Sequence, residues 1–536
     1  MSLSPFRTQE RLGVAAILLA ASTLLSRLMG LIRDKIISWQ FGAGSEADLY
    51  FAAFVVPDCI NYLLAGGFMS ITIIPLLGKA FANDTKDAWA FFSCVVTWMA
   101  LASTILTLGC MLCANPLADL LAPGFSPSQR LRLATFMRII LPAQIFFLTG
   151  SCATALLFLR RQFRVPALSP LIYNAAIIAA GLLLPFILSL LNNTSYHEES
   201  NRVGMLGYCI GVSIGAFLGA FALPLAVARQ GEFHLRPCLT HPLMRRFCII
   251  ALPLMLGQTI IMLDEQLLRV FGSLLQEGTV SLLNYARRIS QVPIGLVGQA
   301  AAVASYPFLV QLINDGKTAQ LQETLCKAMK TCLLLSIPIA CCMIACSGSI
   351  ITLLFHGGRF GVQETMATIP LMDCMLCVVP FWVVYMVLVR AFYAYQNTIC
   401  PAVTGTIVTL LALPVYFWVT RTHSPLALAI TSAISILCYV LWLFVLWNKR
   451  YPRLIGLIPF AGKILACALP ATLCTALLHN ALYDAYPASP LASIGILALS
   501  GTLYLLIMGG LALCVPSLKP SVHEMLSRIP LRRKRS

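Results

Sequence analysis

The stretch LLSRLMGLIRDKIISWQFGAGSEADLYFAAF, Leu24–Phe54, decides the class of fold, because charged residues interrupt a segment that is otherwise apolar. The charged residues that matter most here are Arg27, Arg33, Asp34 and Asp48. A charge at the centre of a bilayer-spanning helix costs about 2.5–3.5 kcal/mol even on the lenient insertion scales. Residues kept at that cost are expected to have a function.

The apolar composition of this stretch extends over the whole chain. Of 536 residues, 59% are hydrophobic and 11% are charged, and the mean hydropathy is +0.85. A soluble domain has about 45–50% apolar and about 25% charged residues. Apolar runs long enough to cross about 30 Å of hydrocarbon recur from end to end. We therefore predict an all-α polytopic membrane protein with about 14 transmembrane helices, at residues 12–39, 48–80, 89–113, 131–159, 167–191, 205–228, 247–271, 279–312, 328–355, 364–393, 400–420, 424–447, 457–480 and 491–515.

The net charge of +17 is distributed unevenly between alternate loops. With the amino terminus inside, the inner loops and the tail hold 23 Lys and Arg residues and the outer loops hold 5. The positive-inside rule then places both termini in the cytoplasm. The charge is accounted for by topology, so no nucleic-acid partner is predicted. The basic tail, residues 519–536, is interpreted as an anchor on anionic membrane lipids.

The sequence lacks the patterns that metal, redox and nucleotide sites require. Two C-x-x-C pairs, Cys110/Cys113 and Cys374/Cys377, fall within predicted helices, where cysteine usually acts as a small packing residue. The histidines show no H-E-x-x-H spacing, and no P-loop pattern occurs. We predict no cofactor, no metal site and no enzymatic activity.

Two stretches of the chain resemble each other when the sequence is shifted. FGAGSEADLYFAAFVVP ends at Pro57 and LLQEGTVSLLNYARRISQVP ends at Pro293, a shift of 236 residues. RRQFRVPALSP contains Pro166 and AYQNTICPAV contains Pro401, a shift of 235. Each copy spans six helices, and this even number gives both copies the same orientation. The sequence therefore predicts a parallel repeat of two six-helix lobes, residues 1–235 and 236–450, followed by two further helices in residues 451–518.

The membrane-embedded charges lie mainly in the first two helices of each predicted copy. Arginine binds phosphate through two parallel hydrogen bonds, so a set of buried arginines favours an anionic ligand such as a pyrophosphate. This interpretation applies to Arg27, Arg33 and Arg288. Structural ion pairs between helices are the alternative, and they are the favoured interpretation for Asp34, Asp264 and Arg269.

Several motifs resemble the MurJ (MviN) lipid II flippases of the MOP exporter superfamily. They are SRLMGLIRD (26–34), FGAGSEADLYFAAFVVP (41–57), LAPGF (121–125), FRVPALSPLIYN (163–174), NYARRISQVPIGLVGQA (284–300), LFHGGRFG (354–361) and FYAYQNTICP (392–401). The first, second and fifth are specific as a set. The match covers most of the chain.

The resemblance implies a transporter of the bacterial inner membrane. It implies that undecaprenyl-pyrophosphate-linked peptidoglycan precursor, lipid II, moves to the outer leaflet by alternating access, with its head group in a cationic central cavity. A groove beside the last two helices would hold the lipid tail. The family's essential arginines map onto Arg27, Arg33 and Arg288, and its acidic residue after the G-x-G turn maps onto Asp48.

The resemblance also bears on coupling and on protein partners. Some members are thought to use sodium or the membrane potential, which makes Asp264 the candidate ion ligand. Cell-wall synthesis proteins are the protein partners that such a role implies.

The chain departs from the family pattern at three positions. Asn61 and Gly66 stand where the family has an arginine and an acidic residue, and Arg287 stands where it has an acidic residue. One hypothesis is that Arg287 takes over part of the pyrophosphate contact of the arginine missing at Asn61. The other is that Arg287 pairs with Asp264 or Glu265.

Two other functions are alternatives to lipid II transport. A flippase for another polyprenyl-linked oligosaccharide would have the same fold. A membrane-embedded glycan transferase would need a large outer loop with acidic or histidine residues, whereas the predicted outer loops are short.

The predicted topology is tested with reporter fusions. Fusions after Arg164, Arg246 and Arg453 should report a cytoplasmic location, and fusions near Asn193 and His423 an external one, because the positive loops stay inside. The measurement is the activity of paired reporters that work on only one side of the membrane. A reversed result at any one site would contradict both the span count and the repeat.

Overall fold

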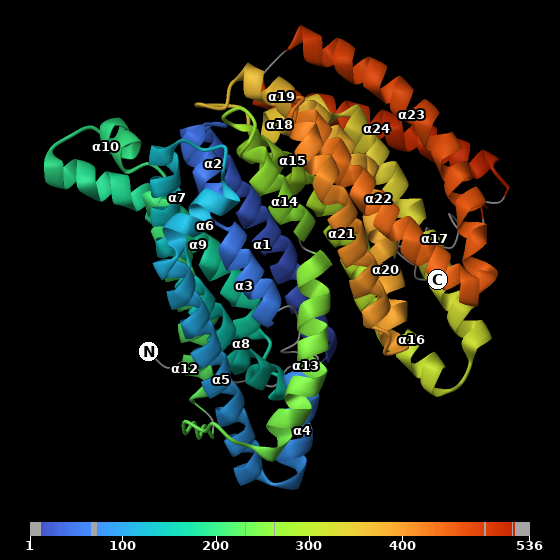
Figure 1. The fold of residues 1–536 in the computed structure, drawn as a ribbon. Helices are drawn as coiled ribbons and strands as arrows, with labels where there is room; N and C mark the ends of the chain where they lie inside the picture. Colours follow the sequence, from blue (N-terminus) through green and yellow to red (C-terminus); the bar gives the residue numbers. More distant parts are fainter. Residues whose placement is uncertain are drawn as a thin grey trace, which may run out of the picture. The chain divides into compact units, whose positions relative to one another are not determined.

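Helices form nearly all of the regular structure in the computed structural model (Figure 1). The structure describes residues 12–65, 72–230, 232–261, 263–486, 489–516 and 518–519. Among these residues the only β-type pairing is an isolated bridge between Gly357 and Phe360. Gly66 and the basic tail from residue 520 lie outside the described residues. The all-α prediction is confirmed.

The chain forms two compact units, residues 1–281 and 282–536. The helices of the first unit are α1 (Leu12–Phe41), α2 (Ser45–Ala52), α3 (Val55–Ala65), α4 (Ile74–Asn83), α5 (Thr85–Leu112), α6 (Ala114–Leu121), α7 (Pro127–Ile140), α8 (Ala143–Leu159), α9 (Arg164–Asn192), α10 (Tyr196–Val203), α11 (Leu206–Gly215), η3 (Ala216–Ala222), α12 (Leu223–Ala228), α13 (Pro242–Ile261) and α14 (Leu263–Gly272).

The second unit begins within the first turn of α15. Its elements are α15 (Thr279–Pro293), η4 (Ile294–Gln299), α16 (Ala300–Asn314), α17 (Thr318–Ala345), α18 (Ser347–Leu354), α19 (Val362–Cys377), α20 (Val379–Ala394), α21 (Ile399–Thr420), α22 (Pro425–Arg450), η5 (Pro452–Gly456), α23 (Leu457–Ala485) and α24 (Pro490–Cys514). The repeat predicted a lobe boundary at residue 235, whereas α13 and α14 belong to the first compact unit.

Twelve helical segments of the described residues are long and apolar enough to cross a membrane. Neither α1 nor the α13–α14 pair is among them, so the count of 14 stays a prediction. Several segments consist of two helices in sequence, such as α7 and α8, which form the segment Pro127–Leu159. The break there falls at Leu141 and Pro142, because proline lacks the N–H that would continue the hydrogen-bond ladder.

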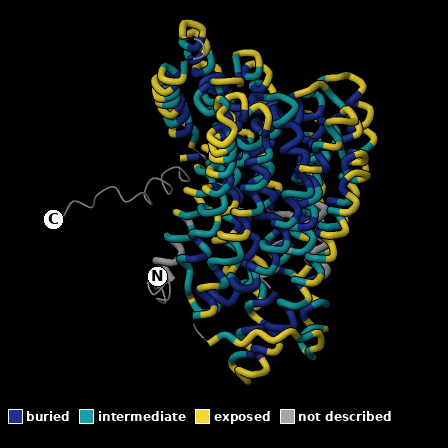
Figure 2. Tube along the Cα trace, turned by 90° about the vertical axis from the view of Figure 1, so that its left-hand side faces the viewer, coloured by how far each residue is buried: buried dark blue, intermediate teal, exposed yellow. Residues whose placement is uncertain are grey.

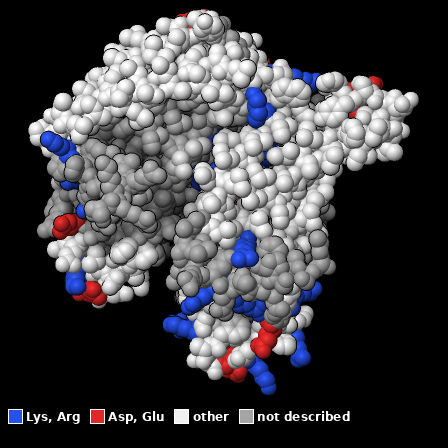
Figure 3. Space-filling view, turned by 180° about the vertical axis from the view of Figure 1, so that it is seen from behind, with Lys and Arg blue, Asp and Glu red and all other residues white. Residues whose placement is uncertain are grey.

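The side chains that stay exposed along the helices are largely apolar. On α23, Leu465, Leu469, Leu473 and Leu477 follow one another at four-residue spacing and are 42–65% exposed. Buried and exposed positions alternate along the helices in Figure 2. On the face drawn in Figure 3 most of the surface is uncharged, and many of the charged side chains lie toward the bottom of the picture. The apolar stripe that these four leucines form on α23 suits contact with lipid acyl chains.

Local backbone features recur at the spacing that the repeat predicts. Gly42 and Gly278 both have positive φ, 62° and 90°, and lie 236 residues apart. Arg161 and Gln396 also share positive φ, 56° and 57°, at a separation of 235.

A third recurrence is a helix cap. The N–H of Ser126 donates to Gln129 Oε1, and the N–H of Gly361 donates to Glu364 Oε2, each at 2.8 Å. These local coincidences, like those of Gly42 with Gly278 and Arg161 with Gln396, support two copies of one supersecondary pattern.

A polar seam joins α23 to α18 within the second unit. His479 Nε2 lies 2.8 Å from Ser349 Oγ, and the hydroxyl of Tyr483 lies 2.8 Å from that of Thr352. Ser349 and Thr352 are fully buried and His479 is 2% exposed. Hydrogen bonds between buried side chains of this kind help to hold membrane helices together.

Glycines let α11 approach α9 closely in the first unit. A Cβ built on Gly211 would lie 2.6 Å from Ile177 Cα, and one on Gly207 would lie 2.8 Å from Ala180 O. Small residues at a helix interface allow the backbones to approach, which is how membrane helices gain packing energy. The close packing of α11 on α9 therefore depends on the lack of side chains at these two positions.

We expect Gly211→Ala to lower the thermal unfolding temperature of the detergent-solubilised protein, because the added methyl group meets backbone atoms. The matched control is Gly109→Ala on α5, where a Cβ would have no neighbour within 4 Å. That change should be neutral or stabilise the helix by about 0.5–1 kcal/mol. Equal effects of the two variants on the unfolding temperature would contradict the close packing of α9 and α11.

Candidate functional site: the membrane-embedded charges

Arg33 lies on α1 and is held by two side chains. Its Nε and Nη2 donate to Asp34 Oδ1 at 3.0 and 2.8 Å, and its Nη1 donates to Asn174 Oδ1 of α9 at 3.2 Å. Arg33 is 8% exposed and Asp34 is 1% exposed. The ion pair offsets the cost of burying either charge alone.

Within the part of the chain that the structure describes, these three contacts leave two N–H groups of Arg33, because a guanidinium carries five. Two parallel N–H donors match two oxygens of a phosphate. Asn174 in turn donates to Pro170 O at 3.0 Å and to Ser26 Oγ at 3.4 Å, so its amide is held in place by α9 and α1. The sequence predicted Arg33 for this site but did not identify Asn174, whose only signal was its place at the end of FRVPALSPLIYN.

Asp48 caps the first turn of α15. Its Oδ2 accepts the N–H of Gly278 and its Oδ1 accepts the N–H of Ser281, both at 2.7 Å. The first N–H groups of a helix have no partner inside the helix, and a carboxylate there satisfies them and complements the helix dipole. Asp48 is 2% exposed, and both of its oxygens are engaged. A substrate contact for Asp48 stays a prediction.

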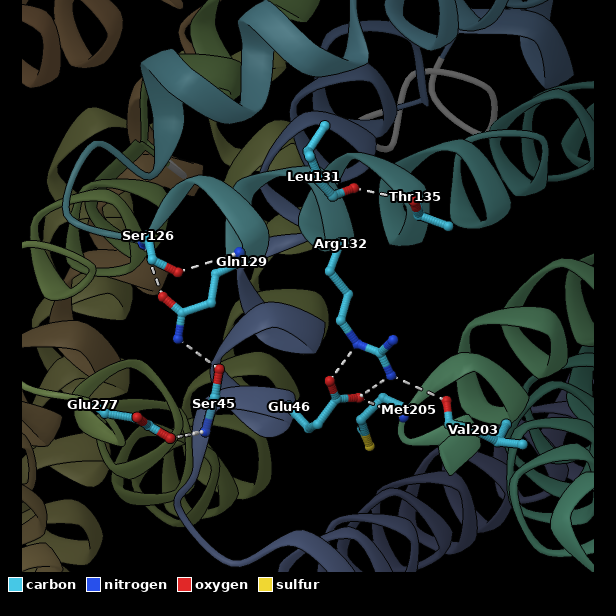
Figure 4. Close-up of polar contacts among 10 residues, drawn as sticks. All are labelled: Ser45, Glu46, Ser126, Gln129, Leu131, Arg132, Thr135, Val203, Met205 and Glu277. Atoms are coloured by element: carbon cyan, nitrogen blue, oxygen red, sulfur yellow. Dashed lines mark hydrogen bonds and ion pairs between the residues drawn. The ribbon is translucent and has the colours of Figure 1, made fainter. Parts of the chain in front are cut away.

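Glu277 makes the reciprocal contact at the start of α2. Its Oε1 accepts the N–H of Ser45 at 2.7 Å (Figure 4). The Ser45 hydroxyl also accepts a hydrogen bond of 2.7 Å from Gln129 Nε2. The first turn of α2 and the segment at the start of α15 therefore satisfy each other's N–H groups. The Gly42 and Gly278 turns are related by the repeat, but which carboxylates would cap them was not predicted.

Glu46 forms a second network beside this turn (Figure 4). Both of its oxygens pair with the Arg132 guanidinium of α7, and Oε2 accepts the N–H of Met205 at 2.9 Å. Arg132 also donates to Val203 O at 3.2 Å. The segment that follows α10 is thereby attached to α2 and α7. The sequence did not identify Arg132 as part of such a network.

The short helix α10 lies between two predicted spans and carries a buried carboxylate. Glu199 Oε1 accepts hydrogen bonds from Asn192 Nδ2 at 2.9 Å and from Thr194 Oγ1 at 3.0 Å. These hydrogen bonds, that from Asn192 above all, hold the pKa of Glu199 below its ordinary value, because they favour the charged form. Glu199 therefore stabilises the connection between α9 and α10 as an anion.

Arg269 of α14 is buried between two carboxylates. It donates to Asp58 Oδ2 of α3 and to Glu265 Oε1, both at 2.7 Å, and to Gln266 Oε1 at 3.0 Å. The interpretation of Arg269 as part of a structural ion pair is confirmed. Asn61 is half-buried on α3, one turn beyond Asp58.

The remaining predicted residues are half-buried. Arg27 lies on α1, and Asp264 lies in the first turn of α14. Arg287 and Arg288 belong to α15 in the second unit. Arg287 Nη2 donates to Ser432 Oγ of α22 at 3.3 Å. The two hypotheses for Arg287 both stay predictions.

The described residues contain no group of three or more His, Cys, Asp or Glu side chains placed to hold a metal ion. The features that the structure does supply are cations buried in apolar helices and carboxylates that fix those cations or cap helices. Such an arrangement can bind and orient an anionic group. The fold and these charges together define a polytopic α-helical membrane protein of the transporter type.

The comparisons with known proteins agree with this class. The family model for the lipid II flippase MurJ matches residues 37–489. The chain belongs to the lipid II flippase MurJ family.

Curated relatives from several bacteria carry the description probable lipid II flippase MurJ. The protein of Borreliella burgdorferi is 23% identical, with 81% of this chain and 83% of that protein covered. The protein of Rickettsia prowazekii is 24% identical, with 92% and 97% covered. These relatives are named as flippases, a class of transporter and not of enzyme.

Solved structures show the same fold. A lipid II flippase MurJ in an inward closed conformation matches with a TM-score of 0.74 at 22% identity, over 92% of this chain and 98% of that chain. An inward-facing multidrug resistance MATE family transporter of the MOP superfamily matches with a TM-score of 0.63 at 14% identity, over 82% and 99%. At these identities the likeness concerns the fold alone.

We expect Asp48→Ala to lower the thermal unfolding temperature, because it leaves the buried N–H groups of Gly278 and Ser281 without acceptors. An unsatisfied buried donor costs about 1–3 kcal/mol. Asp48→Asn should have a smaller effect, since one acceptor oxygen remains. The measurement is thermal unfolding of the purified protein in detergent.

The control for this prediction is Asp119→Ala on α6. The side chain of Asp119 is 60% exposed and pairs with Arg130 at 3.0 Å. An exposed ion pair contributes about 0–1 kcal/mol, so this variant should unfold near the wild-type temperature. If Asp48→Ala behaves like Asp119→Ala, the carboxylate does not act as a cap.

Proposed function

We propose that this protein moves lipid II, the undecaprenyl-pyrophosphate-linked peptidoglycan precursor, from the inner to the outer leaflet of the bacterial cytoplasmic membrane. The observation that carries the proposal is the family match over residues 37–489. The relative from Borreliella burgdorferi is named as a probable lipid II flippase, and the match covers 83% of that protein.

The substrate chemistry fits the buried cations. A pyrophosphate carries negative charge and several acceptor oxygens, and bidentate arginine contacts suit it. In the proposed mechanism Arg27, Arg33 and Arg288 hold the head group while the protein alternates between inward and outward access. Arg33 contributes the two N–H groups that Asp34 and Asn174 leave available.

Asp34 and Asn174 fix the direction of the Arg33 guanidinium before the substrate arrives. A preorganised cation loses less side-chain entropy on binding than a mobile one. The ion pair with Asp34 also balances the charge of Arg33 in the empty state, which lowers the cost of keeping Arg33 among apolar helices. Coupling to sodium through Asp264, or to the membrane potential, would supply the driving force.

The second part of the proposal concerns the lipid and the surroundings. The apolar stripe of α23 offers a surface for the polyprenyl tail, in accord with the tail groove expected beside α23 and α24. Both termini would lie in the cytoplasm. Cell-wall synthesis proteins that make or consume lipid II would be its partners.

The experiment that tests the function is depletion of native lipid II transport in a host bacterium that expresses this chain. Growth should be restored, because the chain would supply the missing transport step. Membrane levels of the chain are measured by immunoblotting in the same cells. Failure to restore growth at normal membrane levels would contradict the proposal.

Single substitutions in the same assay test the arginines. Alanine at Arg27, Arg33 or Arg288 should abolish complementation at near-normal membrane levels, because the anion loses its bidentate contact. Lysine should restore growth only in part, since it keeps the charge but lacks the planar fork. Arg421→Ala, an exposed arginine that lies over the Phe417 ring, is the matched control and should complement fully. Full activity of all three alanine variants would show that the buried cations do not bind substrate.

A further inference from the structure

The segment that joins the two predicted copies is docked along α5. This strap, residues 232–241, connects α12 to α13 without helical structure. In Figure 1 it crosses the lower part of α5 on its way to α13. Arg160 at the end of α8 donates to Glu232 O and so holds the beginning of the strap.

Hydrogen bonds from α5 satisfy the backbone of the strap. Ser93 Oγ donates to His234 O at 3.3 Å and accepts the N–H of Arg236 at 3.1 Å. Thr97 Oγ1 accepts the N–H of Cys238 at 3.4 Å. Trp98 Nε1 donates to Leu239 O at 2.9 Å.

The spacing of these contacts follows from helix and strand geometry. Ser93 and Thr97 are one turn apart on α5, a rise of about 6 Å. Two residues of extended chain cover about 6.6 Å, so the N–H groups of Arg236 and Cys238 match them. The residue between them is Pro237, which has no N–H to leave unsatisfied.

The strap also covers buried side chains of α5. The Trp89 ring packs edge-on against Phe233 at 5.7 Å and against His234 at 5.9 Å between centroids. Ser93 is 2% exposed, and Cys94, which lies beside Cys238, is fully buried. The strap therefore fits a specific face of α5.

The far end of the strap fixes the start of α13 to the start of α5. His241 Nε2 lies 3.2 Å from Asp87 Oδ1, and His241 Nδ1 accepts the N–H of Leu243 at 3.2 Å. The pairing with Asp87 assigns the proton to Nε2, which leaves Nδ1 as the cap of α13. Arg269 ties the following helix, α14, to Asp58 of α3.

These contacts attach α13 and α14 to helices of the compact unit that ends at Ser281, beyond the end of the first predicted copy of the repeat. We propose that the strap stays docked on α5 during transport, so that α13 and α14 move with the first unit although they open the second copy of the repeat. The conformational hinge then lies at the start of α15. The docked position of the strap is independent of the proposed function. That the strap stays docked during transport rests on that function.

Cys94 reports directly on the docked strap. The chain is reconstituted in lipid vesicles, treated with a maleimide with and without lipid II, and analysed for modification of each cysteine by mass spectrometry. A docked strap protects Cys94 equally in both conditions. Loss of two or more hydrogen bonds on addition of lipid II would raise Cys94 modification by about tenfold or more. A rise of that size would overturn the proposal.

Weakening the docking tests whether the attachment matters. The triple variant Ser93→Ala, Thr97→Val, Trp98→Phe removes the hydrogen bonds that these three side chains make to the backbone of the strap. Cys94 modification should then rise by about tenfold or more while transport falls. The matched control is Ser103→Ala, because the buried Ser103 hydroxyl of α5 donates to Ala100 O of its own helix. Increased Cys94 modification with unchanged transport would show that the attachment is not needed and would overturn the proposal.

Locking the strap gives the opposite test. Cys94 and Cys238, which lie beside each other, are oxidised to a disulfide with copper phenanthroline and oxygen, which accepts the two electrons and two protons, so no linker has to enter between the strap and α5. Cys94→Ser is treated in parallel as the control for oxidation elsewhere. The rate of lipid II transport by the cross-linked protein should stay within about twofold of the rate of the Cys94→Ser control. A lock on a permanently docked strap adds less than about 0.5 kcal/mol to the activation free energy of transport. Loss of transport on cross-linking alone would show that the strap must lift. Modification of Cys94 needs no transport, so an inactive wild-type protein would count against the proposed function and not against the docked strap.

Discussion

Hydrocarbon offers no hydrogen bonds, and the polar groups in this chain are arranged accordingly. A charge or a free N–H inside the membrane must find its partner within the protein. Arg33 is held by Asp34 and Asn174, and Arg269 by Asp58 and Glu265. The buried charges therefore occur in sets that draw on more than one helix.

Buried N–H groups at helix ends and in connecting segments need partners within the protein as well. Asp48 satisfies the first N–H groups of α15, and Glu277 satisfies that of Ser45 at the start of α2. The strap between α12 and α13 finds its acceptors and donors on α5. Irregular backbone in this protein is stable where a neighbouring helix supplies side-chain partners.

These contacts also relate the fold to the proposed transport. Arg33 combines a neutralising carboxylate with two N–H groups that stay available for an anion. Its position is set by Asn174 and therefore by the packing of α9 on α1. By contrast, Asp48 is fully engaged as a cap, and its contribution to function in this conformation is to hold two turns of the first unit together.

The amino-acid sequence by itself determined the class of fold and most of the spans, and it predicted the repeat. Hydropathy, proline and glycine act over a few residues, so their effects can be predicted from a short stretch of sequence. The positive φ values at Gly42 and Gly278, for example, recur at the shift seen in the sequence. The family motifs predicted Arg33 as a site residue for the same reason.

Only the tertiary structure decided the partners. Asn174 meets Arg33 across 141 residues of sequence, and Asp48 meets Ser281 across 233. The compact unit that ends at Ser281 likewise contains the strap and the ion pairs of Arg269, and the repeat did not predict these contacts. Hydrogen bonds and ion pairs require distances of about 3 Å between atoms, and no periodicity in the sequence specifies which of several buried donors and acceptors will come that close.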